Sequence, residues 1–112
     1  MTMEKWKCSC GYIHDGEAAR DRCPKCGAPA ERFTLLDDAA AERVERSRRS
    51  NVLHCRVVDL ARQIERACND GIKDDLDPGC AKVFEITLAH SYEIMKLSMT
   101  EMQVHAAKNK WG

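Results

Sequence analysis

Four cysteines in the first quarter of the chain form two closely spaced pairs, Cys8 with Cys10 and Cys23 with Cys26. Two such pairs can supply four thiolates to one tetrahedral metal ion. Thiolate sulfur suits iron and zinc, so the spacing predicts a four-cysteine centre for one of these metals. A stretch of about 35 residues has too little apolar surface to fold around a core of its own. We therefore expect the metal to organise this part of the chain.

A glycine follows each cysteine pair, at Gly11 and Gly27. Glycine allows a positive φ and a close approach of the backbone, so we expect amide N–H groups to point at the sulfurs. Such hydrogen bonds stabilise thiolates and, for iron, tune the reduction potential. Trp6, Tyr12 and Phe33 lie where they could form a small aromatic cluster beside the site.

This part of the chain resembles the short rubredoxin-like domain of rubrerythrins, and its N-terminal position is similar to that in rubrerythrins with reversed domain order. The resemblance covers roughly residues 4–34 and leaves the helical remainder unrecognised. It implies a knuckle fold in which the four cysteines hold one iron ion. This iron would cycle between the ferrous and ferric states and so pass single electrons. The residues that carry it are Trp6-Lys7-Cys8, Cys10-Gly11-Tyr12-Ile13-His14-Asp15-Gly16, Cys23-Pro24-Lys25-Cys26-Gly27-Ala28-Pro29 and Phe33.

The first knuckle departs from the pattern of that family. The family has C-x-x-C-G-Y, whereas this chain has C-x-C-G-Y, with one residue fewer between the two ligands. Side chains at positions i and i+2 of an extended chain point to the same side, so the shorter pair can still chelate. We expect the tighter loop to lose or displace one N–H donor to sulfur. Iron and zinc therefore both remain candidates for the native metal.

The composition excludes several classes of function. The chain has 112 residues, with 18 basic and 18 acidic side chains and no formal net charge. This balance argues against general binding to nucleic acid or to an anionic membrane surface. No apolar run approaches the ~20 residues that span a bilayer. No secretory signal is visible, and the seven cysteines are typical of metal ligands in a reducing compartment, so we expect a cytoplasmic protein.

The chain divides into two parts with different sequence patterns. Residues 1–36 are rich in turn signals and predict a small, metal-bound β knuckle domain. Residues 37–112 predict an all-α antiparallel hairpin, with helices at about 38–69 and 78–108. Three short strands are expected in the first part, at Glu4–Lys7, Tyr12–His14 and Arg32–Thr34.

Capping residues mark where the helices should begin and end. Asp37 or Asp38 can cap the N-terminus of the first helix, and Gly71 suits the position just past its C-terminus. Asp77 suits the N-cap of the second helix, and Pro78 suits its first position. These signals predict a turn between two long helices near residue 75.

The apolar residues of the helices form more stripes than one hairpin can bury. The first helix has one stripe with steps of three and four residues, whereas the second has two. One partner helix cannot cover both stripes of the second helix. We therefore expect a homodimer that closes into a four-helix bundle. The stripe of the first helix is Leu53, Val57, Leu60, Ile64 and Ala67. The stripes of the second are Phe84, Leu88, Met95, Met99 and Met102, and Val83, Ile86, Ile94, Leu97 and Val104.

A second metal site in the helices is a weaker possibility. Rubrerythrins combine the knuckle domain with a di-iron bundle that uses Glu-x-x-His motifs, and this chain has no Glu-x-x-His. Its nearest approach is His90 followed by Glu93. If such a site exists, these two residues would hold the metal, with Glu65 or His54, across a dimer.

Three further cysteines, Cys55, Cys68 and Cys80, lie in or at the ends of the helices. The simplest interpretation is that they are small, buried apolar residues. Cys68 and Cys80 flank the same turn, so a redox-active pair is an alternative.

These observations predict a small metalloprotein that carries single electrons to or from a partner oxidoreductase. One alternative is a non-redox adaptor in which zinc stabilises the knuckle and the hairpin binds a partner protein. A second alternative is a rubrerythrin-like peroxidase with a di-metal site in the bundle. No catalytic residue is visible, which favours a carrier or binding protein over an enzyme. The physiological role rests on the family resemblance.

Overall fold

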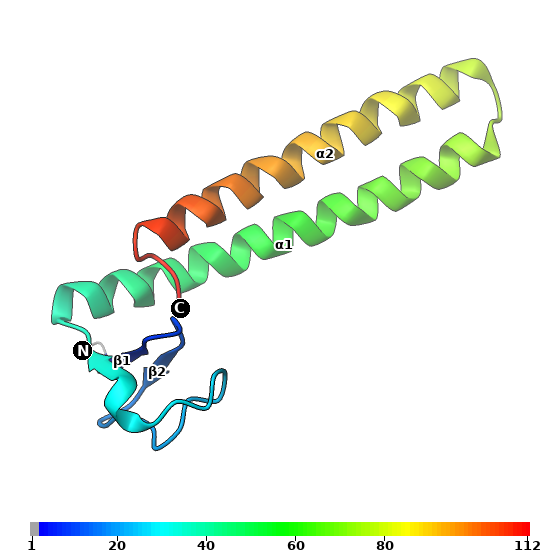
Figure 1. The fold of residues 1–112 in the computed structure, drawn as a ribbon. Coiled ribbons are helices and arrows are strands. Elements are labelled where there is room, and N and C mark those ends of the chain that lie inside the picture. The colour runs from blue at the N-terminus through cyan, green and yellow to red at the C-terminus, as the bar shows by residue number, and fades with distance from the viewer. Residues whose placement is uncertain (1–2) are drawn as a thin grey trace. The chain divides into compact units, whose positions relative to one another are not determined.

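The structure, a computed structural model, describes residues 3–112 (Figure 1). The chain forms two compact units. One contains residues up to Arg49 together with His105–Gly112, and the other contains Ser50–Val104. Within residues 3–112, no helix contains the length of apolar sequence that a bilayer crossing requires. The elements are β1 (Lys5–Cys8), β2 (Ile13–Asp15), a short 3-10 turn (Ala30–Arg32), β3 (Phe33–Leu35), α1 (Asp38–Asp74) and α2 (Pro78–Ala107).

The three strands form an antiparallel sheet in the order β2-β1-β3. Trp6 in β1 lies opposite His14 on one side and Leu35 on the other. Each strand begins one residue later than the sequence predicts. The predicted aromatic cluster is present, because Trp6 and Tyr12 pack against a buried centre of Cys8, Cys23 and Phe33.

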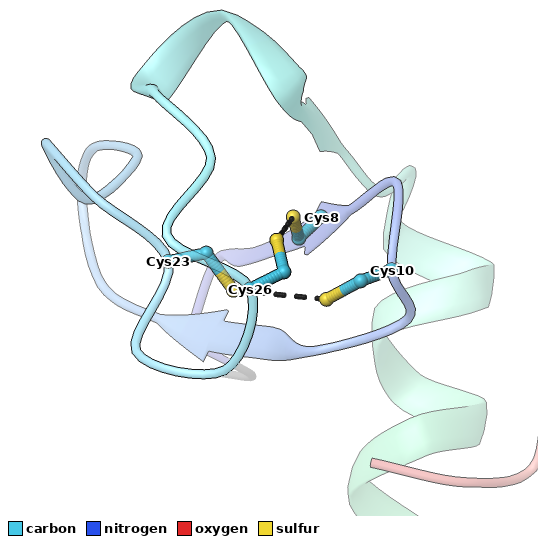
Figure 2. A group of neighbouring side chains, drawn as sticks. All are labelled: Cys8, Cys10, Cys23 and Cys26. Atoms are coloured by element: carbon cyan, nitrogen blue, oxygen red, sulfur yellow. Dashed lines mark hydrogen bonds between the residues drawn. The ribbon is translucent and has the colours of Figure 1, made fainter.

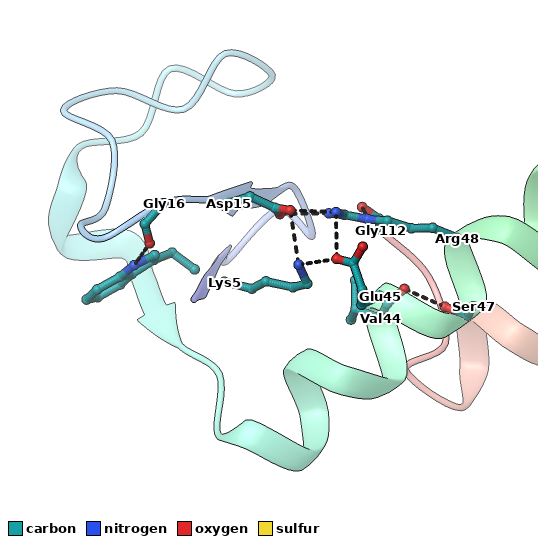
Figure 3. Close-up of polar contacts among 9 residues, drawn as sticks. Lys5, Asp15, Gly16, Val44, Glu45, Ser47, Arg48 and Gly112 are labelled. Atoms are coloured by element: carbon teal, nitrogen blue, oxygen red, sulfur yellow. Dashed lines mark hydrogen bonds and ion pairs between the residues drawn. The ribbon is translucent and has the colours of Figure 1, made fainter. Parts of the chain in front are cut away.

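A network of charged side chains joins the sheet to the start of α1 (Figure 3). The Lys5 side chain is fully buried, and its Nζ lies 3.0 Å from Asp15 Oδ2 and 2.7 Å from Glu45 Oε2. Arg48 donates two parallel hydrogen bonds to the Asp15 carboxylate, at 2.6 and 2.8 Å. Its Nε also donates to the backbone oxygen of Gly112 at 2.7 Å. Because a buried charge without a partner is strongly destabilising, this network holds β1, β2 and the first turns of α1 in one arrangement.

Both helices begin where the capping residues predict. Asp37 Oδ1 accepts a hydrogen bond from the backbone N–H of Ala40 at 2.8 Å. Asp77 Oδ1 likewise accepts one from the backbone N–H of Cys80 at 2.7 Å. Each carboxylate satisfies an N–H group that has no partner within its own helix.

The end of α1 differs from the prediction. The helix continues through Gly71 to Asp74, and the chain reverses at Asp75, which has a φ of 47°. Gly71 is therefore a helical residue and not the residue that ends the helix. A side chain at Gly71 would overlap the ring of Phe84. The glycine thus makes room for this ring between α1 and α2.

Within Ser50–Val104, α1 and α2 run antiparallel and pack along one seam (Figure 1). The most buried seam residues are small or polar, with the exception of Met95. On α1 they are Asn51, Ala61 and Cys68, and on α2 they are Ser91, Met95 and Ser98.

The apolar stripe predicted on α1 is not this seam. Leu53, Val57, Leu60 and Ile64 all remain exposed. The observed seam contains mainly small or polar residues, and the larger aliphatic side chains occupy the neighbouring face. On α2, Met95 of the first predicted stripe is buried in the seam, whereas the second stripe is largely exposed.

Candidate metal centre

The four predicted ligands converge in one cluster (Figure 2). The sulfur atoms of Cys8, Cys10, Cys23 and Cys26 all lie within 4.8 Å of one another. The Cys8 and Cys26 sulfurs are 3.6 Å apart, and the Cys10 and Cys23 sulfurs are 3.7 Å apart. Four sulfurs bound tetrahedrally at ~2.3 Å from one ion would be about 3.8 Å apart. All four are free thiols, so the arrangement fits a metal ion and not disulfide bonds.

Each knuckle contains a tight turn that ends in glycine. Gly11 has a φ of 103° and Gly27 has a φ of 76°, as the sequence predicts. The N–H of Gly11 donates to the carbonyl oxygen of Cys8, and that of Gly27 donates to the carbonyl oxygen of Cys23, both at 2.9 Å. The amides of these two glycines therefore close the turns, and the N–H groups that point at sulfur belong to other residues.

Other backbone groups of the second knuckle reach the sulfurs. Burial raises the pKa of the Cys23 thiol, but the backbone N–H groups of Cys26 and Lys25 and the neighbouring thiols outweigh it, so this pKa falls to about 7. The N–H of Ala28 lowers the pKa of Cys26, whereas burial and the three neighbouring thiols raise it to about 11. In the metal-free chain the Cys23 thiol thus ionises more readily than the Cys26 thiol. A bound cation would favour the thiolate form of its ligands and release protons.

The cluster is half buried. Cys8 is 1% exposed and Cys23 is 2% exposed, whereas Cys10 and Cys26 are exposed. Each knuckle therefore supplies one ligand on the protein side and one on the solvent side. A metal held here would have two ligands that a partner molecule could contact directly.

The predicted second site is not assembled in one chain. His90 Nδ1 lies 3.8 Å from Glu93 Oε2, and both side chains are exposed. Among residues 3–112, the four-cysteine cluster is the one group of three or more Cys, His, Asp or Glu side chains placed to hold a metal. His54 contacts the hydroxyl oxygen of Ser98 at 3.1 Å. A site that His90 and Glu93 share across a dimer stays a prediction.

The three remaining cysteines lie in different environments. Cys68 is buried in the hairpin seam, as the simplest interpretation predicts. Cys55 is instead exposed, with its sulfur 3.8 Å from that of Met102. The Cys80 thiol donates a hydrogen bond of 3.7 Å to the carboxylate of Asp77, and this bond, together with the carboxylate's charge, raises the pKa of the thiol. The redox pair of Cys68 and Cys80 stays a prediction.

Sequence reasoning missed the residues that hold the centre in place. Lys5, Asp15, Glu45 and Arg48 are far apart in the sequence, and each is of a type usually found on the surface. The only local signal for this network was the presence of a lysine, Lys5, within a predicted strand. Because β1 ends at Cys8, the buried ion pairs of Lys5 fix the strand that carries the first ligand.

Comparison with known proteins agrees with this geometry. Residues 6–34 match the family model described as rubrerythrin, rubredoxin-like domain. The chain is 27% identical over 82 residues to reverse rubrerythrin-1 of Clostridium acetobutylicum, an alignment that covers 72% of this chain and 40% of that protein. It is 48% identical over 33 residues to rubrerythrin of Nitratidesulfovibrio vulgaris, which covers 29% of this chain and 17% of that protein. No solved structure matches the chain significantly.

These matches identify residues 6–34 as a rubredoxin-like domain of the rubrerythrin type. The longer alignment also shows homology to a reverse rubrerythrin. The chain spans less than half the length of either of these two relatives.

Proposed function

We propose that this chain is a one-electron carrier in which Cys8, Cys10, Cys23 and Cys26 hold a single iron ion. The observation that carries the proposal is the set of four thiols at tetrahedral spacing in a domain of rubredoxin type. Iron bound by four thiolates supplies reversible exchange of one electron between the ferric and ferrous states.

The residues of the chain support this role in three ways. Two tight turns hold the sulfurs in place, so little rearrangement is needed when the charge of the centre changes. Backbone N–H groups at Lys25, Cys26 and Ala28 offset the negative charge of the thiolates. The exposed ligands Cys10 and Cys26 give a partner oxidoreductase a short route to the centre.

Metal analysis and visible spectroscopy on protein from its native source test this proposal. We expect one iron per chain, strong visible absorption from the oxidised centre, and reversible bleaching when one electron per iron is added. Cys10→Ser should remove this absorption, whereas Cys80→Ser, which lies outside the centre, should leave it intact. A chain that contains zinc and shows no reversible redox wave would contradict electron transfer.

A non-redox adaptor is the second candidate, and one observation favours it. The hairpin exposes a row of large aliphatic side chains on each helix, which is unusual for a surface with no partner. In that case zinc would fill the same four ligands and the hairpin would be the working surface. A rubrerythrin-like peroxidase would need additional metal in the helices, so a ratio of one metal per chain would exclude it.

A further inference from the structure

Aliphatic side chains are exposed along both helices of the hairpin. These residues, which we call the outer face, are more than one third exposed although each is Leu, Ile or Val. They repeat at steps of three or four residues on α1. On α2 the steps are three, eight and three, and His90 lies midway in the step of eight. The outer face consists of Leu53, Val57, Leu60, Ile64, Val83, Ile86, Ile94 and Leu97.

The two rows lie on the same side of the hairpin. Every member stands one position before a buried or half-buried residue of the seam, as Leu60 precedes Ala61 and Leu97 precedes Ser98. One position is a rotation of about 100° around the helix axis. The two helices are antiparallel and their seams face each other. A step of one residue toward the N-terminus therefore leads to the same side of the pair on both helices. The eight side chains therefore form one continuous apolar surface.

The opposite side of the hairpin has a different character. The positions that follow the seam residues carry several charged side chains, among them Asp59, Arg62, Arg66 and Lys96. This side is suited to water, whereas the outer face is suited to burial. The asymmetry between the two sides is what a two-layer helical assembly requires.

We propose that the outer face binds the outer face of a second copy of this chain, which closes a four-helix bundle. The eight side chains are each 38–73% exposed, which for residues of this size amounts to several hundred Å², and a stable interface buries ~800 Å² of each partner. Two identical apolar faces of two helices each complete the core of such a bundle. A surface of this size exceeds what most monomers expose.

His90 is the one polar side chain within the row on α2, between Ile86 and Ile94. Single polar residues in apolar helical interfaces set the register in which the partners pair. In the proposed dimer His90 would have this role.

The oligomeric state of the full, metal-loaded chain tests the proposal. Light scattering at about 10 μM should give twice the chain mass of 12.7 kDa. Leu97→Glu places a charge in the outer face, where Leu97 is 73% exposed, and should weaken dimerisation at least ~100-fold. Met99→Glu is the matched control, because Met99 lies on the other flank of Ser98 and is 48% exposed. This variant should remain a dimer.

Circular dichroism and metal content should be unchanged in both variants, which separates loss of pairing from loss of folding. A monomer at 100 μM would overturn the proposal and leave the outer face to a different protein. Equal dimerisation of the two variants would also overturn it. Neither result depends on which metal the cysteines bind, so this test and that of electron transfer are independent.

Discussion

At the scale of single residues, the first knuckle is one residue shorter than in the family, yet its two cysteine sulfurs still reach the four-sulfur cluster. Cys8 ends β1, and the turn closed by Gly11 brings Cys10 back to the cluster within three residues. The N–H groups that act on the Cys23 and Cys26 thiols come from the longer, second knuckle.

Asp15 is the titrating residue with the clearest effect on stability. Its hydrogen bonds with Arg48 lower its pKa from 3.8 to about 2, against an opposing effect of burial and with a further contribution from Lys5. Because the folded pKa lies below the unfolded one, this stabilisation is complete above about pH 4 and is lost as the pH falls from about 4 to 2. A shift of this size corresponds to ~2 kcal/mol. Since the carboxylate is partly exposed, we expect about 1 kcal/mol.

Asp15→Asn should therefore lower the free energy of unfolding by about 1 kcal/mol at neutral pH. The gap to the wild-type protein should shrink as the pH falls from 4 toward 2. Urea unfolding followed by Trp fluorescence measures it, over the pH values at which metal analysis shows that both proteins retain their metal. Glu31→Gln, an exposed residue outside the network, should show no such gap. A gap that stays constant down to pH 2 would contradict the assignment to Asp15.

At the scale of elements, packing determines where α1 ends. Helix propensity favours a stop at Gly71, but the Phe84 ring fills the space beside this glycine and the helix continues for three more residues. Burial of an aromatic ring contributes more free energy than the ~1 kcal/mol by which glycine disfavours a helix.

Gly71→Ala should consequently destabilise the hairpin. In an exposed helix the same change stabilises by about 1 kcal/mol, whereas here the new methyl group would overlap Phe84, and we expect a net loss of about 1–3 kcal/mol. Thermal unfolding followed by circular dichroism measures it. In a Phe84→Leu background, the added methyl group should no longer be destabilising. A rise in melting temperature on Gly71→Ala alone would show that the ring does not occupy this space.

At the scale of the whole molecule, the two compact units have different sources of stability. In the unit that contains the knuckle, the buried cluster of Cys8, Cys23 and Phe33 is built around two of the metal ligands. The hairpin unit is built from two long helices and contains none of the four ligands. We therefore expect the free energy of metal binding to stabilise the fold of the first unit and not that of the hairpin unit.

Cys23→Ser removes a buried ligand and should abolish tight metal binding. We expect residues 3–36 to lose their ordered structure while most of the helical circular dichroism remains. Metal content, far-ultraviolet circular dichroism and the dispersion of knuckle amide signals in NMR spectra measure the effect. Cys80→Ser, which changes a cysteine outside the centre, should retain both metal and structure. An ordered knuckle in the metal-free Cys23→Ser protein would refute this coupling.

The metal centre and the helix starts could be predicted from the sequence because they depend on local spacing. Two residue pairs with chelating spacing need only a turn to converge, and a capping carboxylate acts on an N–H group three residues away. The family resemblance, confirmed for residues 6–34, added the knuckle fold. The strands were found to within one residue for the same reason.

The tertiary structure decided three features that local pattern could not. It paired Lys5 with Asp15 and Glu45, it let α1 pass through Gly71, and it chose which stripe of α1 faces α2. Helical periodicity specifies the angles between stripes but not which stripe is buried. That choice depends on how the side chains of both helices fit together, and in the structure small residues such as Ala61 and Ser91 are the ones buried in the seam. The larger aliphatic side chains were therefore left on the outer face.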